Sequence, residues 1–391
     1  MKIFIIHNRY RHRAGEDSVF DQEVSLLQKH GHQVKTLIAD NLDIQSQTTW
    51  QKIKLAVNTI WSQKSHQDVT KYLQEFQPDI VHVHNFLPLL SPSIFYACKR
   101  QNIPVIQTIH NYRLGCPAAT FFRHGKICEL CVQKNLLASI YHRCYRESYL
   151  QTATVAMMLQ IHRWLGTWNN VVTAYIALTP FVKQKLIEIG IPEHKIYIKP
   201  NFLANPQPNP KTPEFGKHYL YVGRLVPEKG IHILLEAYQQ SNSQYPLIII
   251  GSGELQPLVE EAAKYNPHIQ YLGQQPRAIV LEYMRQAIAL IFPSIWYEGF
   301  PLTILEAYSQ SLPVVGSDIG SVSYAIENGV TGLTFPVGDE QALSQIFSSI
   351  EADPKKWIEL KEKVLDSLSD TYFPNHNIDC LLEIYRNVIS S

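Results

Sequence analysis

The sequence contains no apolar run close to the roughly 18 to 20 residues that a membrane-spanning helix needs. Its first apolar run, IFII, directly follows Met1-Lys2 and is typical of a buried strand, not of a signal peptide. Low-complexity tracts are also missing, and a composition of 45% hydrophobic and 18% charged residues is typical of a folded chain. We therefore expect a cytoplasmic protein, in which disulfides are a disfavoured fate of the six cysteines.

The sequence also lacks a complete glycine fingerprint for a dinucleotide. The apolar run PLIIIG leads into Gly251-Ser252-Gly253-Glu254, but no third glycine follows at the required spacing. A G-x-G after a strand lets a ligand approach the backbone closely, although such a segment is more often simply a tight turn. A dehydrogenase with a nicotinamide cofactor is therefore disfavoured.

Short apolar runs alternate with helical patterns along the whole chain. The runs are KIFII, QVKTLIA, DIVHVH, PVIQTIH, AYIAL, HYLYVG, PLIIIG, IQYLG, ALIFPS and PVVGS. Continuous Val- and Ile-rich strands between helices are typical of parallel sheets covered on both faces. Because 391 residues are too many for one ordinary core, the pattern predicts two doubly wound, Rossmann-like α/β domains.

A stretch rich in Pro and Asn, residues 205–216, interrupts the pattern and predicts a linker. It would separate an N-terminal domain, residues 1–204, from a C-terminal domain, residues 217–375. A last helix is expected at 376–391, and the sequence does not reveal what that helix packs against.

The net charge of +1 conceals opposite charges in the two halves. Residues 1–203 carry 23 Lys and Arg against 13 Asp and Glu, a balance of +10, and the rest carry 12 against 21, a balance of −9. The asymmetry indicates two surfaces with different partners, unless it is simple drift in surface composition.

Two basic residues, Arg224 and Lys229, follow the predicted strand HYLYVG in a turn that runs from Gly223 to Gly230. Ligands of doubly wound folds bind outside the carboxyl ends of the strands. The next helix start would add backbone N–H groups and the positive end of a dipole, so the turn suits a diphosphate. The alternative is a loop with two solvated cations.

Two carboxylates flank the predicted helix start in the segment EGFPLTILE, at Glu298 and Glu306. Pro301 suits the first helical position and would leave the N–H groups of Leu302 and Thr303 aimed outward. Carboxylates accept hydrogen bonds from the paired hydroxyls of sugars and ribose. The alternative is a surface Glu298 and a Glu306 that serves as a salt-bridge partner.

Taken together, GRLVPEKG, IIGSGEL, EGFPLTILEA with its E-x7-E spacing, GSDIGS and NGVTGLTFPVGD resemble the family-4 retaining glycosyltransferases of the GT-B fold. The resemblance runs essentially through the whole chain and includes the AGEDSVF loop, the HVHN strand end and the TIHNYR segment. It implies two Rossmann-like domains that face a cleft, a nucleotide-sugar donor held mainly by the C-terminal half, and a role in polysaccharide assembly.

The resemblance also implies roles for individual residues. Arg224 and Lys229 resemble the pair that binds the donor diphosphate, and Glu306 resembles the carboxylate that holds the ribose. His110 matches a catalytic-site histidine near the sugar and the acceptor, and Glu298 would position the transferred sugar. Further donor-binding candidates are Gly15, Gly223, Gly251, Leu272, Gly299, Phe300, Leu302 and Thr303, and the base would rest near Tyr271, Leu272 and Gly273. The sequence departs from the family at Ala14, where a second glycine is common beside Gly15.

Retention of configuration is likewise implied by the resemblance alone. The sequence has no D-x-D pair, the usual signature of an Mn²⁺ or Mg²⁺ ion on the donor diphosphate, so we expect no catalytic metal. Front-face substitution is favoured, with cations that stabilise the departing phosphate. The competing hypotheses are a nucleotide-sugar epimerase and a protein that binds nucleotide-sugars without catalysis.

Four cysteines follow at a spacing of C-x11-C-x2-C-x12-C: Cys116, Cys128, Cys131 and Cys144. Four thiolates can hold a structural Zn²⁺ that folds an insertion without a core of its own. Free thiols and disulfides are the alternatives.

The segment Trp50 to Lys64 has apolar residues at helical spacing, with Lys52, Lys54 and Lys64 around them. A basic amphipathic helix with tryptophans can lie in a membrane interface. We therefore expect the basic N-terminal half to meet an anionic membrane that carries a lipid-linked acceptor. The alternative is an ordinary helix packed on the N-terminal sheet, and no nucleic-acid partner is indicated.

Overall fold

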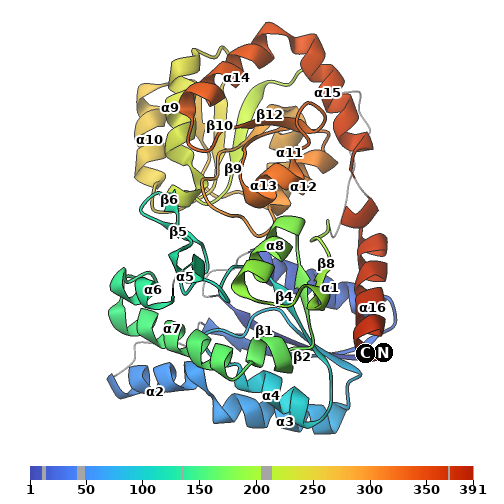
Figure 1. The fold of residues 1–391 in the computed structure, drawn as a ribbon. Helices are drawn as coiled ribbons and strands as arrows, with labels where there is room; N and C mark the ends of the chain where they lie inside the picture. The colour runs from blue at the N-terminus through green and yellow to red at the C-terminus, as the bar shows by residue number, and fades with distance from the viewer. Residues whose placement is uncertain (11–14, 42–48, 134, 204–213, 369, 391) are drawn as a thin grey trace. The chain divides into compact units, whose positions relative to one another are not determined.

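The computed structural model describes residues 1–10, 15–41, 49–133, 135–203, 214–368 and 370–390. These residues form two compact units (Figure 1). Unit 1 comprises residues 1–121, 128–201 and 374–391, and unit 2 comprises 122–127 and 202–373. Each unit is built on a six-stranded parallel sheet, so the predicted pair of doubly wound α/β domains is confirmed.

The sheet of unit 1 has the strand order β2-β1-β3-β4-β7-β8. Its strands are β1 (Lys2–Arg9), β2 (Gln33–Asp40), β3 (Ile80–Val83), β4 (Val105–Ile109), β7 (Ala174–Ala177) and β8 (Ile196–Ile198). The apolar side chains of β1 from Ile3 to Ile6 are fully buried, because helices cover the sheet on both faces (Figure 1). Chain order reverses between β1 and β3, since β2 lies on one side of β1 and the later strands lie on the other.

The helices of unit 1 vary from short turns to seventeen residues. They are α1 (Gly15–Lys29), α2 (Thr49–Ile60), α3 (Gln63–Phe76), α4 (Ser93–Arg100), α5 (Leu130–Gln133), α6 (Leu137–Tyr141), α7 (Tyr149–Trp164), the π-helix η2 (Thr167–Val171), α8 (Pro180–Ile189), the 3-10 helix η3 (Glu193–Lys195) and α16 (Pro374–Ser390).

The segment Trp50 to Lys64 is not one helix, as the periodicity predicts, but parts of two. Helix α2 ends at Ile60, and α3 begins at Gln63. The break has a local cause, because Ser62 is the N-cap of α3 and its side chain accepts a hydrogen bond from the Ser65 N–H. A serine that caps a new helix therefore overrides an apolar pattern that continues through it.

The C-terminal helix α16 belongs to unit 1 and contacts α1. The Tyr385 hydroxyl lies 2.8 Å from Nδ1 of His82 on β3, and the Asn377 side chain donates to the Pro200 carbonyl at 2.8 Å. The last residues of the chain thus complete the N-terminal unit.

The sheet of unit 2 has the strand order β11-β10-β9-β12-β13-β14. Its strands are β9 (His218–Val222), β10 (Leu247–Ile250), β11 (Ile269–Tyr271), β12 (Ala287–Phe292), β13 (Val314–Ser317) and β14 (Gly332–Phe335). Its helices are η4 (Pro227–Lys229), α9 (Ile231–Ser241), α10 (Gln256–Tyr265), α11 (Arg277–Gln286), α12 (Leu302–Ser309), α13 (Gly320–Ala325), α14 (Glu340–Ala352), α15 (Pro354–Asp366) and η5 (Asp370–Tyr372). The hairpin of β5 (Phe122–Arg123) and β6 (Lys126–Ile127) also groups with this unit, where Ile127 packs against the core.

Candidate active site

The strand order of unit 2 reverses between the neighbouring strands β9 and β12. From β9 the chain proceeds to β10 and β11 on one side, and from β12 it proceeds to β13 and β14 on the other. Such a reversal is where open α/β sheets bind ligands. The loops after these two strands touch, because the Ile295 N–H donates to the Glu228 carbonyl at 3.0 Å. Gly230 has a φ of +68°, and a Cβ there would collide with the Pro293 carbonyl, so only glycine allows this approach.

Lys229 and Glu298 form an ion pair at this position. The Lys229 Nζ lies 2.6 Å from the Glu298 Oε1, which also accepts from Ser294 Oγ at 2.7 Å and from Trp296 Nε1 at 2.8 Å. Burial alone would raise the pKa of Glu298, but Lys229, Ser294 and Trp296 hold it below its ordinary value. The pair is therefore a buried carboxylate with a cation beside it, not the surface glutamate of the alternative reading.

Arg224 differs from Lys229 in its exposure. Its side chain is 62% exposed, and its Nη2 lies 3.5 Å from the Glu228 Oε1, which is the limit of a hydrogen bond. The guanidinium is therefore held weakly, and little interaction energy opposes its turning toward an anion.

Glu306 makes the salt bridge that the alternative reading describes. Its Oε1 lies 2.7 Å from Nε of Arg277, the first residue of α11. The sequence patterns do not single out Arg277, since nothing in them brings α11 next to α12. A carboxylate has lone pairs beyond those used on one guanidinium, so this contact and ribose binding are compatible.

The start of α12 is one residue later than the sequence predicts. Pro301 is the N-cap, Leu302 is the first helical residue, and the Leu302 N–H donates to the Phe300 carbonyl at 3.1 Å. The prediction that the Leu302 N–H points outward without a partner is therefore wrong, because the turn at Gly299 and Phe300 folds back on it. Phe300 itself packs against the unit 2 core, and Thr303 lies in the first turn, half-buried.

The other donor candidates of unit 2 lie at the carboxyl ends of β9, β10 and β11. Gly223 follows β9, and Gly251 follows β10 with a φ of +148°, where a Cβ would collide with the Gly223 carbonyl. Leu272 follows β11, and its N–H is committed to the Ile249 carbonyl at 3.0 Å. A base at this edge would therefore have to be read by groups other than the Leu272 N–H.

In unit 1 the AGEDSVF segment begins helix α1 at Gly15, which is exposed. A Cβ built on Gly15 has no atom within 4 Å, so local packing does not demand glycine there. The departure from the family pattern at Ala14 lies outside the described residues.

A pocket of unit 1 lies at the carboxyl ends of β3 and β4. It is lined by His84, Asn85, Phe86, Leu87, Gln107, Thr108, Ile109, His110, Asn111, Arg113 and Leu114. His110, predicted from the sequence, is thus a pocket residue. Its Nε2 lies 3.0 Å from Nδ1 of His84, and the two rings are stacked.

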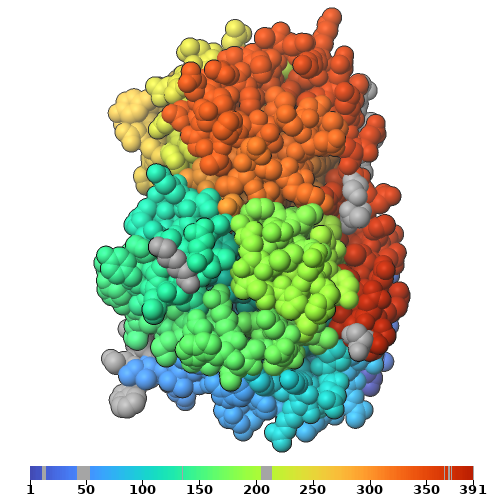
Figure 2. Space-filling view, in the orientation of Figure 1, coloured from blue at the N-terminus to red at the C-terminus, as the bar shows by residue number. Residues whose placement is uncertain are grey.

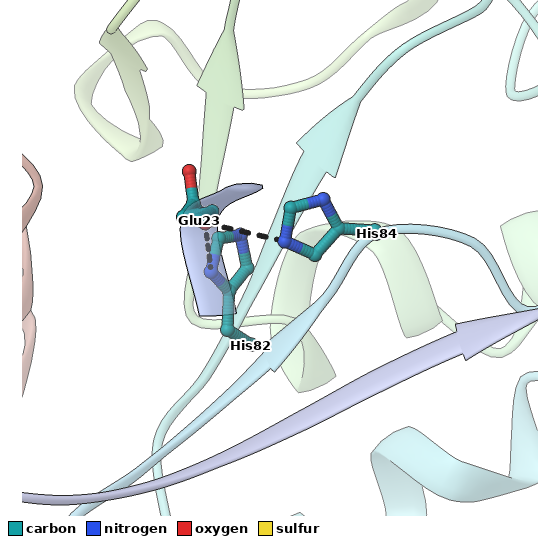
Figure 3. Close-up of side chains that lie close together, drawn as sticks. All are labelled: Glu23, His82 and His84. Atoms are coloured by element: carbon teal, nitrogen blue, oxygen red, sulfur yellow. Dashed lines mark ion pairs between the residues drawn. The ribbon is translucent and has the colours of Figure 1, made fainter. Parts of the chain in front are cut away.

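Behind this pocket lies a buried polar cluster next to the point where chain order reverses in the unit 1 sheet. Figure 3 shows His82 and His84, on and just after β3, with both rings directed at Glu23 of α1. The Glu23 Oε1 lies 3.2 Å from Nδ1 of His82 and 3.2 Å from Nε2 of His84, and its Oε2 lies 2.9 Å from the Lys199 Nζ. Among the described residues, Glu23, His82 and His84 are the group of three that could hold a metal ion.

Burial sets the charge states of this cluster. Burial alone would raise the pKa of Glu23, but Lys199, His82 and His84 hold it well below its usual range. Burial, reinforced by His82, lowers the pKa of His84 to about 4, and burial together with His84 lowers the pKa of His110 well below its ordinary value. At neutral pH Glu23 is therefore an ionised carboxylate, and the imidazoles of His84 and His110 are neutral.

Sequence reasoning missed Glu23, His82, His84 and Lys199. A usable signal is the H-x-H spacing in HVHN, because residues two apart on a strand point to the same face. Glu23 and Lys199 are 176 residues apart and carry no local pattern.

The four cysteines are neighbours around the β5-β6 hairpin. Cys116 precedes the hairpin, Cys128 and Cys131 follow it, and Cys144 follows α6, all as free thiols. Burial, followed by the thiols of Cys116, Cys144 and Cys128, raises the pKa of Cys131 to about 12. The other three thiols therefore lie within electrostatic reach of Cys131, although in the described part of the chain no three of them lie within 4.8 Å of one another.

Comparisons with known proteins agree in both halves of the chain. Residues 19–203 match Glycosyltransferase Family 4, and residues 206–364 match Glycosyl transferases group 1. The chain is similar to glycogen synthase of Mycobacterium tuberculosis, with 27% identity over 72% of this chain and 62% of that protein. It is also similar to phosphatidyl-myo-inositol mannosyltransferase of Mycolicibacterium smegmatis, with 23% identity over 74% of this chain and 66% of that protein. The matches thus span less than two thirds of these relatives.

Solved structures share the fold across the chain. Anabaena Alr3699/HepE in complex with UDP covers 100% of both chains, with a TM-score of 0.67 and 18% identity. Sucrose-phosphate synthase from Thermosynechococcus elongatus covers 100% of this chain and 99% of its own, with a TM-score of 0.72 and 17% identity. Two consecutive family matches and this two-sheet fold identify the chain as a GT-B glycosyltransferase of the group 1 and family 4 type.

Proposed function

We propose that this chain transfers a sugar from a nucleotide-diphosphate sugar to an acceptor hydroxyl, with retention of configuration and without a catalytic metal. The observation that carries the proposal is the Lys229–Glu298 pair at the reversal point of the unit 2 sheet. A diphosphate at this position would meet the Lys229 ammonium, the exposed Arg224 and the end of a parallel sheet. The structure of HepE with UDP-glucose, a neighbour with the same fold, supports a nucleotide-sugar as the class of donor.

In the proposed reaction the anomeric carbon–phosphate bond breaks as the acceptor oxygen attacks from the same face. Negative charge develops on the departing phosphate, where Lys229 and Arg224 stabilise it, and that phosphate takes the acceptor proton. Glu298, ionised at neutral pH, holds the Lys229 ammonium and accepts from a sugar hydroxyl. His110 lines the pocket of unit 1, which is proposed to receive the acceptor.

Glu306→Ala is expected to weaken binding of the nucleoside diphosphate about tenfold or more, because a hydrogen bond to a charged group contributes about 1.5 to 3 kcal/mol. Calorimetric titration with UDP, GDP and ADP measures the effect on whichever nucleotide binds. Glu282→Ala is the matched control, since Glu282 also pairs with an arginine, 3.0 Å from Arg285 in α11. Equal affinity in the Glu306 variant and the parent would remove Glu306 from the ribose site.

A second part of the proposal is that unit 1 docks on an anionic membrane that carries the acceptor. Three of its helices expose large apolar side chains: Ile53 and Val57 on α2, Leu137 and Tyr141 on α6, and Leu150, Met157 and Trp164 on α7. Residues 150, 157 and 164 recur every seven positions and form one stripe along α7. Both α2 and α6 contact α7, and Figure 2 shows α6 and α7, in green, on the face of unit 1 toward the viewer.

Charge near these helices suits an anionic surface. Exposed Lys54, Arg143 and Arg146 lie on or between them against one exposed acidic residue there, Glu147, and residues 49–64 contain no acidic residue. Each basic residue near an anionic leaflet contributes about 1 kcal/mol, which salt screens. None of the described helices is long and apolar enough to cross a bilayer.

The chain is therefore expected to cosediment with phosphatidylglycerol vesicles at low salt and to be released from them at high salt. It is not expected to bind phosphatidylcholine vesicles. Trp164→Ser should weaken the binding, because Trp164 is 77% exposed on the stripe. Tyr265→Ser is the matched control, because Tyr265 is 76% exposed on unit 2. Failure to bind anionic vesicles at low salt would point to a soluble acceptor or a protein partner instead.

The four cysteines are proposed to hold one structural zinc ion, which would draw the thiols together as thiolates. Metal analysis of protein purified without chelator is expected to find about one zinc per chain, and Cys131→Ser is expected to lose it. Cys98→Ser is the control, since Cys98 is a buried thiol in α4. Metal-free protein with four titratable thiols in the segment would establish the free-thiol alternative.

A further inference from the structure

A continuous line of buried polar contacts leads from Lys199 to the pocket of unit 1. Lys199 Nζ contacts the Glu23 Oε2 at 2.9 Å, Glu23 Oε1 contacts the His84 Nε2 at 3.2 Å, and His84 Nδ1 contacts the His110 Nε2 at 3.0 Å. Glu23, His84 and Lys199 are almost completely buried, and His110, at the end of the line, is half-buried and lines the pocket.

The chemistry of these groups allows one arrangement of protons. An ionised carboxylate only accepts hydrogen bonds, so the His84 nitrogen that faces Glu23, Nε2, must carry the proton. Neither Glu23 Oε1 nor His84 Nε2 makes an aligned hydrogen bond among the described residues. Their 3.2 Å contact is therefore the ionic contact that orients His84 Nε2, and Glu23 Oε1 has a second contact of 3.2 Å with His82 Nδ1. Because His84 is neutral, its Nδ1 holds a lone pair and accepts from the Nε2–H of His110.

We propose that Glu23, acting through His84, fixes the tautomer of His110, so that Nε2 carries the proton and Nδ1 offers a lone pair to a hydroxyl group in the pocket. This inference rests on the proposed function for the identity of that hydroxyl, which is the sugar acceptor or a hydroxyl of the transferred sugar. His110 would then accept a hydrogen bond from the hydroxyl and orient it. Glu23 and His84 are positioning residues, since both act through His110.

Lys199 explains why Glu23 is negatively charged while His84 stays neutral. Its ammonium neutralises Glu23 at a distance of 2.9 Å, so the carboxylate stays ionised without protonating His84. The same contact disfavours a divalent cation at Glu23, His82 and His84, because a metal ion would add a second cation to a fully buried cluster.

Long-range ¹H–¹⁵N NMR of the full chain labelled with [¹⁵N]histidine tests the inference, with the His110 signals assigned through a His110→Gln variant. At pH 7.5 the Nε2–H tautomer of His110 is expected to exceed the other about tenfold or more, since a hydrogen bond that ends on a charged group contributes at least about 1.4 kcal/mol. A mixed population or an Nδ1–H tautomer would overturn the proposal. Purified protein with one equivalent of metal on His84 would overturn it as well.

Glu23→Gln is expected to invert the tautomer of His110. Lys199 donates to the amide oxygen of the new side chain, so the amide NH₂ faces His84 Nε2, which then has to accept. The proton of His84 moves to Nδ1, and His110 must accept at Nε2 and carry its own proton on Nδ1. An unchanged His110 tautomer in a folded Glu23→Gln protein would refute the relay.

Two controls separate the relay from a general structural effect. Glu193→Gln changes a glutamate that pairs with Lys183 at 3.0 Å on the surface of unit 1, and it should leave His110 unchanged. His162 is buried elsewhere in unit 1, with Thr167 and Ile60 as partners, and its signals should stay constant in every variant. If Glu23→Gln does not fold, two other measurements test the relay. One is the tautomer of His110 in the wild-type protein, and the other is a His84→Phe variant, in which His110 is expected to lose its preference for the Nε2–H tautomer. None of these measurements needs a donor, so a failure of nucleotide binding would count against the proposed function alone.

Discussion

Replacing Lys229 with alanine is expected to lower donor turnover by about a hundredfold or more at saturating donor. Removal of one preorganised stabiliser of developing charge costs about 2.7 to 4 kcal/mol of transition-state stabilisation. Lys229 is the firmest candidate for that role, because Glu298 and the Phe292 and Trp296 rings hold its ammonium in place. Arg224→Ala is expected to have an effect of similar size, since its exposed guanidinium is available to the same phosphate.

The variant also removes the cation beside a buried carboxylate, so a folding control is required. Without Lys229 the pKa of Glu298 is expected to rise, while Ser294 and Trp296 still donate to it. Circular dichroism and the melting temperature establish whether unit 2 remains folded, and Lys264→Ala, an exposed lysine of α10, is the matched control. Near-normal turnover in a folded Lys229→Ala protein would mean that the assignment of this lysine is wrong.

Lys199→Met is expected to destabilise unit 1 by about 3 to 5 kcal/mol at neutral pH, because it leaves the Glu23 carboxylate buried without its cation. Hydrogen exchange of the β1 and β3 amides measures this effect in unit 1 alone. Lys183→Met is the matched control, since it breaks a surface ion pair and should cost about 1 kcal/mol or less. The double variant Glu23→Gln with Lys199→Met should recover much of the loss, because the uncompensated charge is gone.

The effect of Lys199→Met depends on pH in a definite direction. In the parent protein the folded pKa of Glu23 lies below its unfolded value of about 4.3. The pair therefore contributes its full stability above that value and loses it as pH falls through the folded pKa. The difference in stability between parent and variant should be largest near pH 7 and should shrink toward pH 4 and below. A stability difference that grows as the pH falls would contradict the account that Glu23 is ionised in the folded protein and paired with Lys199.

The sequence predicts the strands better than it predicts the breaks between helices. All ten apolar runs become strands of the two parallel sheets, because a strand buried on both faces needs continuous apolar residues. Two of the four edge strands, β2 and β11, were among the runs, but the short edge strands β8 and β14 were not, since they are only partly buried and their apolar pattern is weaker. The break at Ser62 depends on a side-chain cap, which hydrophobic periodicity does not record.

Some residues of the candidate sites could be predicted to meet from the sequence, and others could not. Lys229 and Glu298 are 69 residues apart, but each lies in the connection that follows a strand, and strand ends in a parallel sheet meet at one edge. Lys199 directly follows β8 and His84 directly follows β3, so the same rule places both at one edge of the unit 1 sheet, but the apolar runs did not include β8. Glu23 lies in the middle of a helix, so no such rule brings it to His84. Arg277 is hidden for the same reason, because its contact with Glu306 depends on how α11 packs beside α12.

Turnover of nucleotide-sugars tests the central claim most directly. The full chain is incubated in EDTA with UDP-, GDP- and ADP-sugars, and NMR follows the release of the nucleoside diphosphate and the anomeric signal of the sugar as it forms. The account predicts that one donor is consumed, that its sugar first appears with the configuration it had on the donor, and that Lys229→Ala abolishes most of this turnover. Inversion of the anomeric centre, a requirement for Mn²⁺ or Mg²⁺, or an epimerised donor with no sugar transferred would contradict it.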